Sequence, residues 1–404
     1  MIWSGQQVEA IDAVGRWLGR SDEPIFRLFG YAGAGKTTLA KHLAQSAGTV
    51  YFAAYTGKAA SVMRQKGCLM AQTIHQLIYL PSSKSKLLLR QLQGQLVDLI
   101  DQITAEKGDP EKSREVRKLR ELIREEETRT KQPHFTLNPD SPIQGADLVV
   151  IDEVSMVDGK MADDLLSFNV PILALGDPAQ LPPVKGEGFF TRARPDVMLT
   201  EIHRQARGNP VIDLATKVRR GEDLREGEYG NSLVMRGKPE ESLVREADQI
   251  LVGLNRTRRR CNHRMRTLMG RGADPLPVKG DRLVCLRNDH EVGLLNGTIW
   301  EVDHAEVVHD LNRMLLTVHS EEITLTVDAH TQYFTGHEDE LNYWDIREAQ
   351  CFDFGYALTT HKAQGSQWPN VFIFDESWQF RQDSRRWLYT AITRASEKVT
   401  ICRN

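Results

Sequence analysis

The segment from Gly30 to Thr37, GYAGAGKT, limits what this chain can fold into more than any other feature of the sequence. It follows a short apolar run at residues 25–29 and precedes the apolar-periodic run TTLAKHLAQSAG. A strand, a glycine-rich turn and a helix in this order form the phosphate-binding loop of parallel α/β domains. The glycines let backbone N–H groups surround phosphates, and the helix N-terminus adds a partial positive charge.

The polar residues of this loop have separate expected roles. Lys36 would reach the β and γ phosphates of a bound nucleotide, and the Thr37 hydroxyl would ligate Mg²⁺. The loop alone does not distinguish a motor from a kinase or a GTPase. The residues expected to bind the nucleotide here are Gly30, Gly33, Gly35, Lys36, Thr37 and Thr38.

Two acidic residues, Asp152 and Glu153, end a buried-strand pattern, LVVID, at residues 148–152. A carboxylate at the C-terminal end of such a strand emerges beside the phosphate loop of a parallel sheet. We expect Asp152 to hold Mg²⁺ through its water shell, because Mg²⁺ takes few direct carboxylate ligands. We expect Glu153 to orient and deprotonate the attacking water.

Apolar runs alternate with helical patterns along the chain, which predicts an α/β fold with parallel, doubly covered sheets. A second α/β unit is expected to begin near residue 204. The strands expected in the two units lie at residues 25–29, 50–54, 148–152, 171–175, 251–255 and 371–375.

Two segments interrupt this alternation. Residues 84–130 carry leucines near helical spacing and a KGDP breaker, which predicts a helical hairpin inserted into the first unit. Residues 276–335 consist of short β-rich runs joined by turns such as Asn296-Gly297. These runs predict a small antiparallel barrel inserted into the second unit.

The composition excludes several classes of protein. A chain of 404 residues is too long for one ordinary core, so two or more domains are expected. No apolar run approaches the roughly 20 residues that cross a bilayer, and MIWSGQQVEAIDAVGRW lacks the pattern of a secretory signal. The five cysteines are scattered without a CxxC pair, which argues against zinc and disulfides and fits a reducing cytoplasm.

The net charge of −3 does not identify a nucleic-acid-binding protein, although a motor needs positive charge only along its track. The segment from Asn255 to Arg271, NRTRRRCNHRMRTLMGR, is dense in arginine. Two interpretations stay open for it: contacts to a nucleic-acid strand, or a solvated helix face.

The segment from Leu175 to Val184, LGDPAQLPPV, resembles motif III of superfamily 1 helicases. Its QLPPV ending resembles the RecD, Dda and Pif1 branches. The resemblance places Asp177 near the metal. It makes Gln180 a candidate for coupling, because its amide can hydrogen-bond the γ-phosphate and also sense the DNA side.

Two further segments resemble motifs that supply arginines. LTEIHRQ, at residues 199–205, resembles motif IV and implies that Arg204 contacts the γ-phosphate. YTAITRA, at residues 389–395, resembles motif VI and implies that Arg394 is the arginine finger. A guanidinium stabilises charge on the transferring phosphoryl group and cannot deprotonate.

The remaining motifs of the family follow in order. Gln7, in QQVEA, resembles the Q motif that reads adenine, and GYALTTHKAQGSQW resembles motif V, in which Gln364 and Gly365 face ATP. TGKA and TIH resemble motifs Ia and Ib, which lie along the DNA strand and suit phosphate contacts that ignore sequence. The residues implied to bind nucleic acid are Thr56, Gly57, Lys58, Thr73, His75, Thr360 and His361.

The resemblance, which is to the RecD/Dda-like helicases, implies two RecA-like domains at residues 1–202 and 203–404. An insertion at 82–142 lies where the family usually has a short strand-separating pin, so a helical hairpin there departs from the pattern. An insertion at about 272–350 resembles the SH3-like module of the 5′-to-3′ branch.

The same resemblance implies an ATP- and Mg²⁺-dependent helicase that moves 5′-to-3′ on single-stranded DNA and unwinds duplex DNA. It implies a monomeric motor that works at DNA junctions in replication, recombination or repair, in a bacterial or phage-encoded setting, in the cytoplasm and without a membrane. The chain would be either a naturally compact helicase or the core of a larger one.

Three alternatives remain at this point. An RNA helicase would use the same ATP chemistry and differ only in substrate preference. An ATP-dependent translocase or loading module would hydrolyse ATP without separating strands, and the unusual pin region is the feature that bears on it. A small-molecule kinase needs only the phosphate loop and has no use for motifs III, V and VI.

Overall fold

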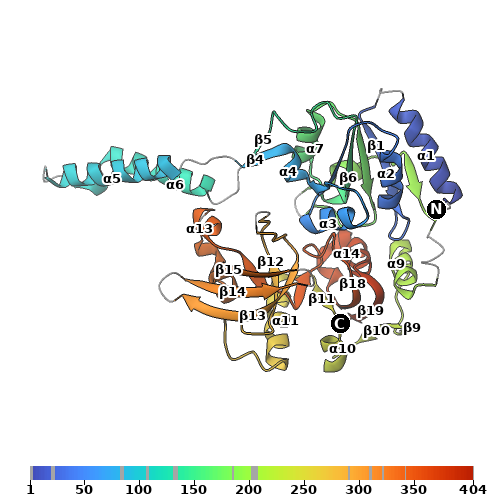
Figure 1. Cartoon of the computed structure of the whole chain (residues 1–404). Coiled ribbons are helices and arrows are strands. Elements are labelled where there is room, and N and C mark those ends of the chain that lie inside the picture. Colours follow the sequence, from blue (N-terminus) through green and yellow to red (C-terminus); the bar gives the residue numbers. More distant parts are fainter. Residues whose placement is uncertain are drawn as a thin grey trace.

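The computed structural model describes residues 3–19, 23–81, 86–105, 109–130, 135–183, 186–201, 208–289, 292–308, 312–320, 323–341 and 343–403. The chain forms two neighbouring parts, each built on a mostly parallel sheet covered by helices, and an antiparallel sheet lies beside the second of them (Figure 1). The expected α/β class is therefore confirmed. We call the parts that carry the two parallel sheets the first unit (residues 3–201) and the second unit (residues 208–403).

The sheet of the first unit is parallel throughout, with the phosphate loop at the end of one inner strand. Alternate strand residues face opposite layers of helices, because successive side chains of a strand point to opposite faces. In order across the sheet, the strands are β3 (Gln72–Thr73), β2 (Val50–Ala54), β6 (Leu148–Asp152), β7 (Ile172–Gly176), β1 (Ile25–Gly30) and β8 (Val197–Leu199).

Both faces of this sheet are buried, which explains its continuous apolar strands. Val149 and Ile151 of β6 pack in the core that holds α4 and α7, whereas Leu148 and Val150 pack in the core that holds α1 and α2. The helices of the first unit are α1 (Gly5–Leu18), α2 (Lys36–Ala44), α3 (Gly57–Gln65), α4 (Ile74–Ile78), α7 (Gly159–Leu166) and α8 (Phe189–Arg192).

The sheet of the second unit is parallel except for its outermost pair. One face packs against α9 and α14, and the other packs against α11 and the antiparallel sheet. In order, its strands are β17 (Ala357–Thr359), β11 (Gln249–Val252), β18 (Trp368–Asp375), β19 (Ala395–Arg403), β10 (Ser232–Arg236) and β9 (Gly227–Tyr229); its helices are α9 (Pro210–Arg220), α10 (Glu241–Arg245), α11 (Asn255–Leu268) and α14 (Ser384–Ile392).

The strand expected at 251–255 ends earlier than predicted, at Val252. The next two backbone N–H groups, those of Gly253 and Leu254, donate to the Glu376 carboxylate instead of to a neighbouring strand. Helix α11 then starts at Asn255, so the chain has left the sheet.

Residues between α11 and β17 form the antiparallel sheet that the sequence predicts in this region. Its end strand β15 also reaches Gln350: the Gln350 N–H donates to Asp328 and the His330 N–H donates to Gln350, at 2.7 and 3.0 Å. This link brings the two ends of the sheet together. In order, its strands are β15 (Thr324–His330), β14 (Arg313–His319), β13 (Ile299–Val308), β12 (Arg282–Cys285) and β16 (Phe352–Phe354), with the short helices α12 (Gln332–Thr335) and α13 (Tyr343–Glu348) beside them.

The first unit also carries the predicted helical hairpin, α5 (Lys86–Ala105) and α6 (Arg114–Thr130). A two-stranded ribbon, β4 (Tyr79–Pro81) and β5 (Phe135–Leu137), connects it to the sheet. The hairpin projects away from both units (Figure 1). None of the helices in the described part of the chain is long and apolar enough to span a membrane.

Candidate functional site

The phosphate loop has the geometry that its glycines predict. Gly33 and Gly35 have φ angles of +80° and +76°, which are unfavourable for residues with a Cβ. Gly30 lies against β8, where a Cβ would come within 2.9 Å of the Leu199 Cβ. The loop thus turns sharply between β1 and α2, and α2 begins at Lys36 with its N-terminus directed at the loop.

Lys36 and Thr37 already have partners in the loop and the neighbouring strand. The Lys36 ammonium donates to the carbonyl oxygens of Gly30 and Tyr31, at 2.7 and 3.3 Å. The Thr37 hydroxyl donates to the Asp152 carboxylate at 2.8 Å. The two residues expected to ligate Mg²⁺ are therefore in direct contact, although 115 positions separate them. Thr38 lies in the first turn of the same helix.

Glu153 follows Asp152 in a strained backbone conformation, with φ +55° and ψ +42°. Its N–H donates to the Asp152 carboxylate at 2.8 Å. Burial raises the pKa of Glu153 above its usual range, and the positive charges of Arg394 and Lys36 partly offset that effect. Strain at a carboxylate beside a phosphate loop is typical of functional positions.

The loop after β7 brings Asp177 and Gln180 to the same place. Asp177 is 1% exposed, and its carboxylate accepts hydrogen bonds from the Ala179 N–H and the Tyr389 hydroxyl, at 3.0 and 2.6 Å. Burial raises the pKa of Asp177, and the Lys36 charge partly offsets this. Within the described residues, the buried Gln180 Oε1 has no hydrogen-bond partner, which leaves an acceptor free for a ligand.

The second unit contributes Arg394, which is 6% exposed and lies just beyond the end of α14. Its guanidinium donates to the carbonyl oxygens of Thr390 and Ser366, at 3.1 and 3.2 Å. It also lies near enough to lower the pKa of both Glu153 and Asp177, which belong to the first unit. The predicted finger is thus held by residues of the second unit, and its charge acts on two carboxylates of the first.

The loop after Asp177 is held by the second unit through Leu181. The Leu181 N–H donates to the Thr390 hydroxyl at 2.9 Å, and the Gln364 amide donates to the Leu181 carbonyl at 3.2 Å. Gln364 therefore contacts the segment that resembles motif III. Gly365, with φ +78°, lies against the first unit, where a Cβ would come within 2.6 Å of the Thr56 hydroxyl.

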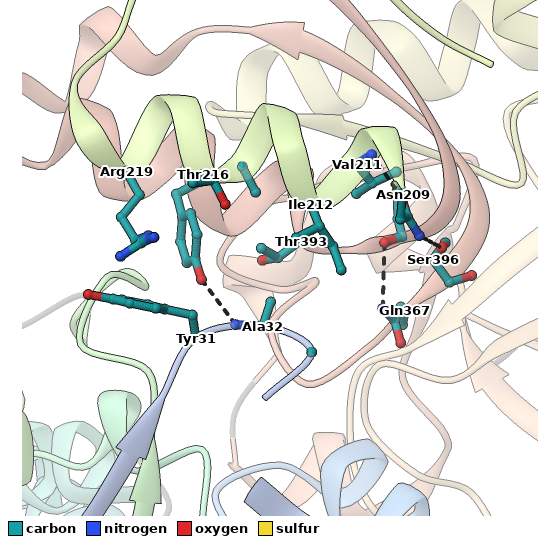
Figure 2. Close-up of a pocket in the computed structure, with 14 residues that line it drawn as sticks. Tyr31, Ala32, Asn209, Val211, Ile212, Thr216, Arg219, Gln367, Thr393 and Ser396 are labelled. Carbon is teal, nitrogen blue, oxygen red and sulfur yellow. Dashed lines mark hydrogen bonds between the residues drawn. The ribbon is translucent and has the colours of Figure 1, made fainter. Parts of the chain in front are cut away.

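A cavity of about 360 Å³ lies between the phosphate loop and α9. Figure 2 shows Arg219 of α9 facing Tyr31 of the loop, and the guanidinium carbon lies 3.4 Å from the centre of that ring. Tyr389 forms another part of the lining, and its hydroxyl accepts a hydrogen bond from the Ala32 N–H at 3.2 Å.

Sequence reasoning gave no role to Tyr31, Arg219 or Tyr389. Tyr31 and Tyr389 lie inside segments that were recognised, GYAGAGKT and YTAITRA. The contacts of all three residues depend on how the two units dock. For Tyr31 and Tyr389, position within a motif is the one feature of the sequence that points to the site, and Arg219 has no such feature.

The amide of Gln7 contacts both the start of α1 and the phosphate loop. Its oxygen accepts from the Ser4 N–H at 3.0 Å in a capping box at the start of α1, and its nitrogen donates to the Ala34 carbonyl at 3.4 Å. Gln7 is buried beside the phosphate loop, where the Q motif is expected. Arg204, the expected γ-phosphate contact of motif IV, lies outside the described residues.

The residues expected along the nucleic-acid strand occupy helix starts and strand ends. Thr56 caps α3 and Thr73 caps α4, each through its hydroxyl, and Gly57 and Lys58 form the first turn of α3. Thr360 is fully buried, and its hydroxyl donates to the Val252 carbonyl at 3.4 Å.

The two histidines of this set are both partly enclosed. His75 packs between the rings of Tyr55 and Tyr79, and His361 packs against Phe380. Burial lowers the pKa of each imidazole, which favours its neutral form.

The arginine-rich segment forms α11, and several of its arginines have acidic partners within the fold. Arg258 pairs with Asp353 at 2.5 Å, and Arg264 pairs with Glu241 at 2.6 Å. Arg266 pairs with Asp281 at 3.0 Å, and both side chains are almost fully buried. These contacts favour the structural interpretation of α11 over the strand-contact interpretation.

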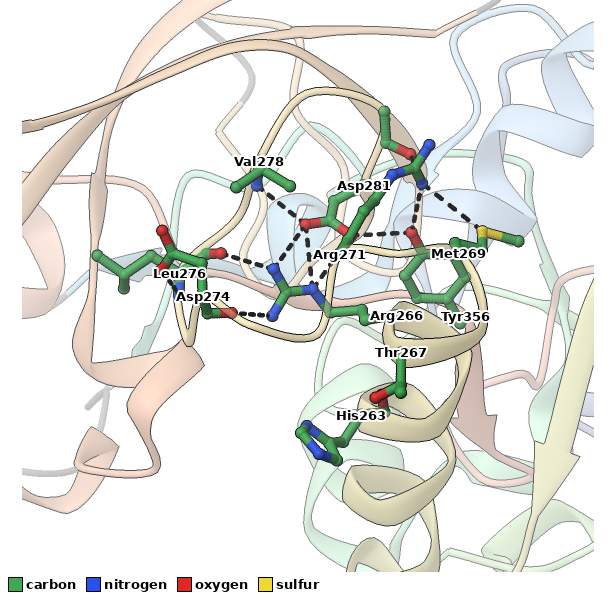
Figure 3. Close-up of polar contacts among 11 residues, drawn as sticks. His263, Arg266, Thr267, Met269, Arg271, Asp274, Leu276, Val278, Asp281 and Tyr356 are labelled. Carbon is green, nitrogen blue, oxygen red and sulfur yellow. Dashed lines mark hydrogen bonds and ion pairs between the residues drawn. The ribbon is translucent and has the colours of Figure 1, made fainter.

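The Arg266–Asp281 pair belongs to a larger network between α11 and the start of β12 in the antiparallel sheet (Figure 3). Asp281 also accepts from the Val278 N–H and the Tyr356 hydroxyl, each at 2.9 Å. Arg266 donates to the carbonyl oxygens of Asp274 and Leu276 as well, at 2.6 and 2.7 Å. A buried ion pair whose remaining donors and acceptors are satisfied favours one arrangement of the segments that it joins, here α11 and the start of the antiparallel sheet.

No cluster of three or more histidine, cysteine, aspartate or glutamate side chains suited to a metal ion occurs in the described residues. The five cysteines are all free thiols.

Comparisons with known proteins show which proteins this chain resembles. A family model described as "AAA domain" matches residues 4–232, and a second, described as "UvrD-like helicase C-terminal domain", matches residues 354–402. The chain is 30% identical over 279 residues to the ATP-dependent RecD2 DNA helicase of Deinococcus radiodurans. That match covers 62% of this chain and 36% of the relative, so the chain spans about a third of the length of the curated relative it matches.

Solved Pif1 helicase structures share the fold. A structure of Pif1 helicases on forked double-stranded DNA has a TM-score of 0.54 and 18% identity, and Bacteroides Pif1 in complex with ADP-AlF3 and single-stranded DNA has a TM-score of 0.51 and 17% identity. In both, the match covers 99% of this chain and 92% of the other. The resemblance found in the motifs is confirmed: the chain belongs to the AAA domain family, and it is similar in sequence to a RecD2 helicase and in fold to Pif1 helicases.

Proposed function

We propose that this chain is an ATP-driven motor that moves 5′-to-3′ along single-stranded DNA and unwinds duplex DNA. One observation carries this proposal: groups for ATP hydrolysis come from both units and meet at their junction. The first unit supplies Lys36 and Glu153. The second supplies Arg394, which follows α14, the helix whose Tyr389 hydroxyl donates to Asp177 of the first unit at 2.6 Å. An ATP site divided in this way is complete only when the units are docked, so hydrolysis can drive relative motion.

ATP is the substrate of this site, and its phosphates would occupy the loop from Gly30 to Thr37. The Thr37 hydroxyl and the Asp152 carboxylate, in contact at 2.8 Å, fit Mg²⁺, because this ion prefers oxygen ligands. When bound there, Mg²⁺ would neutralise charge on the phosphate oxygens. Glu153 would orient the attacking water, and Arg394 would stabilise the charge that develops on the γ-phosphate.

Gln180 is proposed to couple the ATP site to the strand. Its buried amide oxygen has no hydrogen-bond partner in the described part of the chain, and the following residue, Leu181, is held by Thr390 and Gln364 of the second unit. Gln364 and Gly365 are proposed to face the nucleotide from that side. Gln7 and Arg204 are proposed to contact the adenine and the γ-phosphate respectively.

The proposed domains follow the same division. Residues 1–202 and 203–404 would be the two RecA-like domains, with insertions at 82–142 and about 272–350, the second of them SH3-like. Single-stranded DNA is the proposed track, at Thr56, Gly57, Lys58, Thr73 and His75 of the first unit and Thr360 and His361 of the second.

The relatives support DNA as the substrate. The relative from Deinococcus radiodurans is a DNA helicase, and Pif1 structures hold single-stranded or forked DNA. The 5′-to-3′ polarity rests on the branch resemblance alone. We propose a monomeric motor, because the residues assigned to ATP and Mg²⁺ all come from one chain.

The test is unwinding, with ATP and Mg²⁺, of two DNA duplexes that differ only in carrying a 5′ or a 3′ single-stranded tail. Lys36→Ala is the control, because it removes the ammonium expected to bind phosphate. Unwinding of the 5′-tailed duplex alone, lost in the control, supports the proposal. Unwinding of the 3′-tailed duplex alone would keep the motor and overturn the branch assignment.

A second candidate is an ATP-dependent translocase or loading module that does not separate strands. The observation that favours it is the long hairpin of α5 and α6, which stands where a short pin is expected. This candidate predicts ATP hydrolysis stimulated by single-stranded DNA while neither duplex opens. The same assay on RNA duplexes distinguishes an RNA helicase from both.

A further inference from the structure

Tyr389 of α14 links the second unit to two parts of the ATP site in the first. Its hydroxyl donates to the Asp177 carboxylate at 2.6 Å and accepts from the Ala32 N–H at 3.2 Å. Ala32 belongs to the phosphate loop, and Asp177 to the loop after β7. The side chain is only 2% exposed. Its hydrogen bond to Asp177 is buried, and its hydrogen bond from Ala32 lies at the edge of the cavity.

The same stretch of chain carries Arg394, the proposed finger. Tyr389 and Thr390 are consecutive residues near the end of α14, and Arg394 lies two residues beyond it. The Arg394 guanidinium donates back to the Thr390 carbonyl at 3.1 Å, so it is fixed relative to this helix end. Whatever positions Tyr389 on the first unit therefore also positions Arg394 against Glu153 and Asp177.

The hydrogen bond to Asp177 is a strong one of its kind. It is short and has a carboxylate as acceptor, and hydrogen bonds to charged groups in protein interiors are stronger than neutral ones. Within the described residues, the Asp177 carboxylate also accepts a hydrogen bond from the Ala179 N–H at 3.0 Å. Without the Tyr389 hydroxyl, one buried carboxylate oxygen of Asp177 would lose its partner, and so would the Ala32 N–H at the edge of the cavity.

We propose that Tyr389 is a positioning residue for ATP hydrolysis: its hydroxyl holds Ala32 of the phosphate loop and Asp177 in register with Arg394. It acts through these groups and makes the hydrolytic step depend on docking of the second unit. The inference rests on the proposed ATPase function. Neither the phosphate-loop pattern nor the finger pattern contains the contacts of the Tyr389 hydroxyl with Ala32 and Asp177.

The experiment compares Tyr389→Phe with the wild-type chain in steady-state ATP hydrolysis with saturating single-stranded DNA. Phenylalanine keeps the ring and removes only the hydroxyl. We expect kcat to fall by about ten- to hundredfold, the size expected for loss of one hydrogen bond to a charged group. We expect KM for ATP, and the affinity for a non-hydrolysable ATP analogue, to change by less than about threefold, because Lys36 and the loop remain.

Tyr229→Phe is the matched control. Tyr229 lies in β9 of the second unit, outside the ATP site. This change also removes a phenol hydroxyl, which donates to the Arg225 carbonyl at 2.9 Å. Its kcat should equal that of the wild type. A merely structural role for Tyr389 would lower thermal stability and leave the kcat of the folded protein unchanged.

A double-mutant cycle with Asp177→Asn gives a second readout, with kcat expressed per folded molecule so that a loss of stability in Tyr389→Phe does not enter the comparison. If the two residues act together, adding Asp177→Asn to Tyr389→Phe should lower kcat much less than Asp177→Asn lowers it alone. A kcat for Tyr389→Phe within about twofold of the wild type, or fully additive effects in the cycle, would overturn the inference. A wild-type chain that hydrolyses no ATP would instead overturn the proposed function, so the two failures are distinguishable.

Discussion

The Thr37 hydroxyl and the Asp152 carboxylate are joined by a hydrogen bond of 2.8 Å, which connects the start of α2 to the C-terminal end of β6. A hydroxyl and a carboxylate brought together beside a phosphate loop form the oxygen-rich edge that a hard divalent cation requires. The contact joins a loop residue to a strand end that lies 115 positions further along the sequence. It also leads to a direct test of the metal site.

Replacing Asp152 with asparagine should lower ATP hydrolysis by at least about 100-fold, the size expected when one electrostatic group of a preorganised site is lost. Chelation of divalent cations in the wild-type chain should have the same effect, and added Mg²⁺ should reverse it. Asp147→Asn is the matched control, because Asp147 lies at the opposite end of the same strand and caps the Thr49 N–H. Equal activity of the Asp152→Asn and Asp147→Asn variants would contradict the metal assignment.

Arg394→Lys should reduce ATP hydrolysis by roughly 10³-fold or more while an ATP analogue still binds. Lysine keeps the positive charge but cannot form the planar contacts of a guanidinium. Arg386→Lys, on an exposed face of α14 where the arginine pairs with Asp383 at 3.1 Å, should leave hydrolysis unchanged. Parallel measurement of kcat and of analogue affinity separates the two effects. A variant that loses analogue binding to the same extent as hydrolysis would mean that Arg394 supports binding and not the reaction.

How far the sequence predicts this site depends on whether its contacts are local. The phosphate loop was predicted in detail because a strand, turn and helix encode it within one short segment. The capping boxes at Ser4 and Thr73 were equally readable, since each has a glutamine three residues later, and they were missed. For Gln7, that local pattern accounts for the hydrogen bond from the Ser4 N–H to its amide oxygen.

Other contacts could not be predicted from the sequence. Tyr389 and Asp177 are 212 positions apart and meet only because the two units dock. The arginines of α11 gave an ambiguous pattern for a similar reason. Their partners, among them Asp281 and Asp353, lie at the margins of the antiparallel sheet, and its register against α11 is not written in any local motif.

The Arg266–Asp281 pair should be important for stability. Asp281→Asn would leave a buried guanidinium without its counter-charge, and breaking such a pair typically costs about 3–5 kcal/mol in the free energy of unfolding. Glu241→Gln is the control, because it removes the partner of Arg264 from the exposed side of the same helix. An exposed pair is worth about 0–1 kcal/mol. Urea unfolding of both variants measures the difference. Equal unfolding midpoints would show that the network in Figure 3 does not stabilise the fold.

His361 should make stability depend on pH. Burial lowers the pKa of its imidazole below the usual 6.5, with Asp383 acting in the opposite direction. The unfolded chain therefore binds a proton at a higher pH than the folded chain does. This contribution to the free energy of unfolding is fully present above pH 6.5 and is lost as the pH falls through the folded pKa.

The measurement is urea unfolding between pH 7.5 and 5 for the wild type and for His361→Gln. The glutamine variant should lose less stability over this range, because it has no imidazole to protonate. His263→Gln, which replaces an exposed histidine on α11, is the control. Identical pH dependence of His361→Gln and the wild type would contradict the prediction.

The helical hairpin can be removed with little disturbance to the sheet that carries it. Pro81 of β4 lies opposite Phe135 of β5 in antiparallel register, so an Asn-Gly turn can replace residues 82–134 and close the ribbon as a tight hairpin. The ATP site lies in other elements, so hydrolysis stimulated by single-stranded DNA should stay within about twofold of the wild type.

If α5 and α6 separate the strands, unwinding of a 5′-tailed duplex should fall by at least about tenfold in the shortened chain. Movement along single-stranded DNA should continue. It is measured by the displacement of a protein bound to the strand. This combination would assign strand separation to the hairpin and stepping to the two units. Unwinding at the wild-type rate would show that the duplex opens elsewhere. Loss of both unwinding and movement would mean that the hairpin grips the strand, because the ATP site itself is left intact by the deletion.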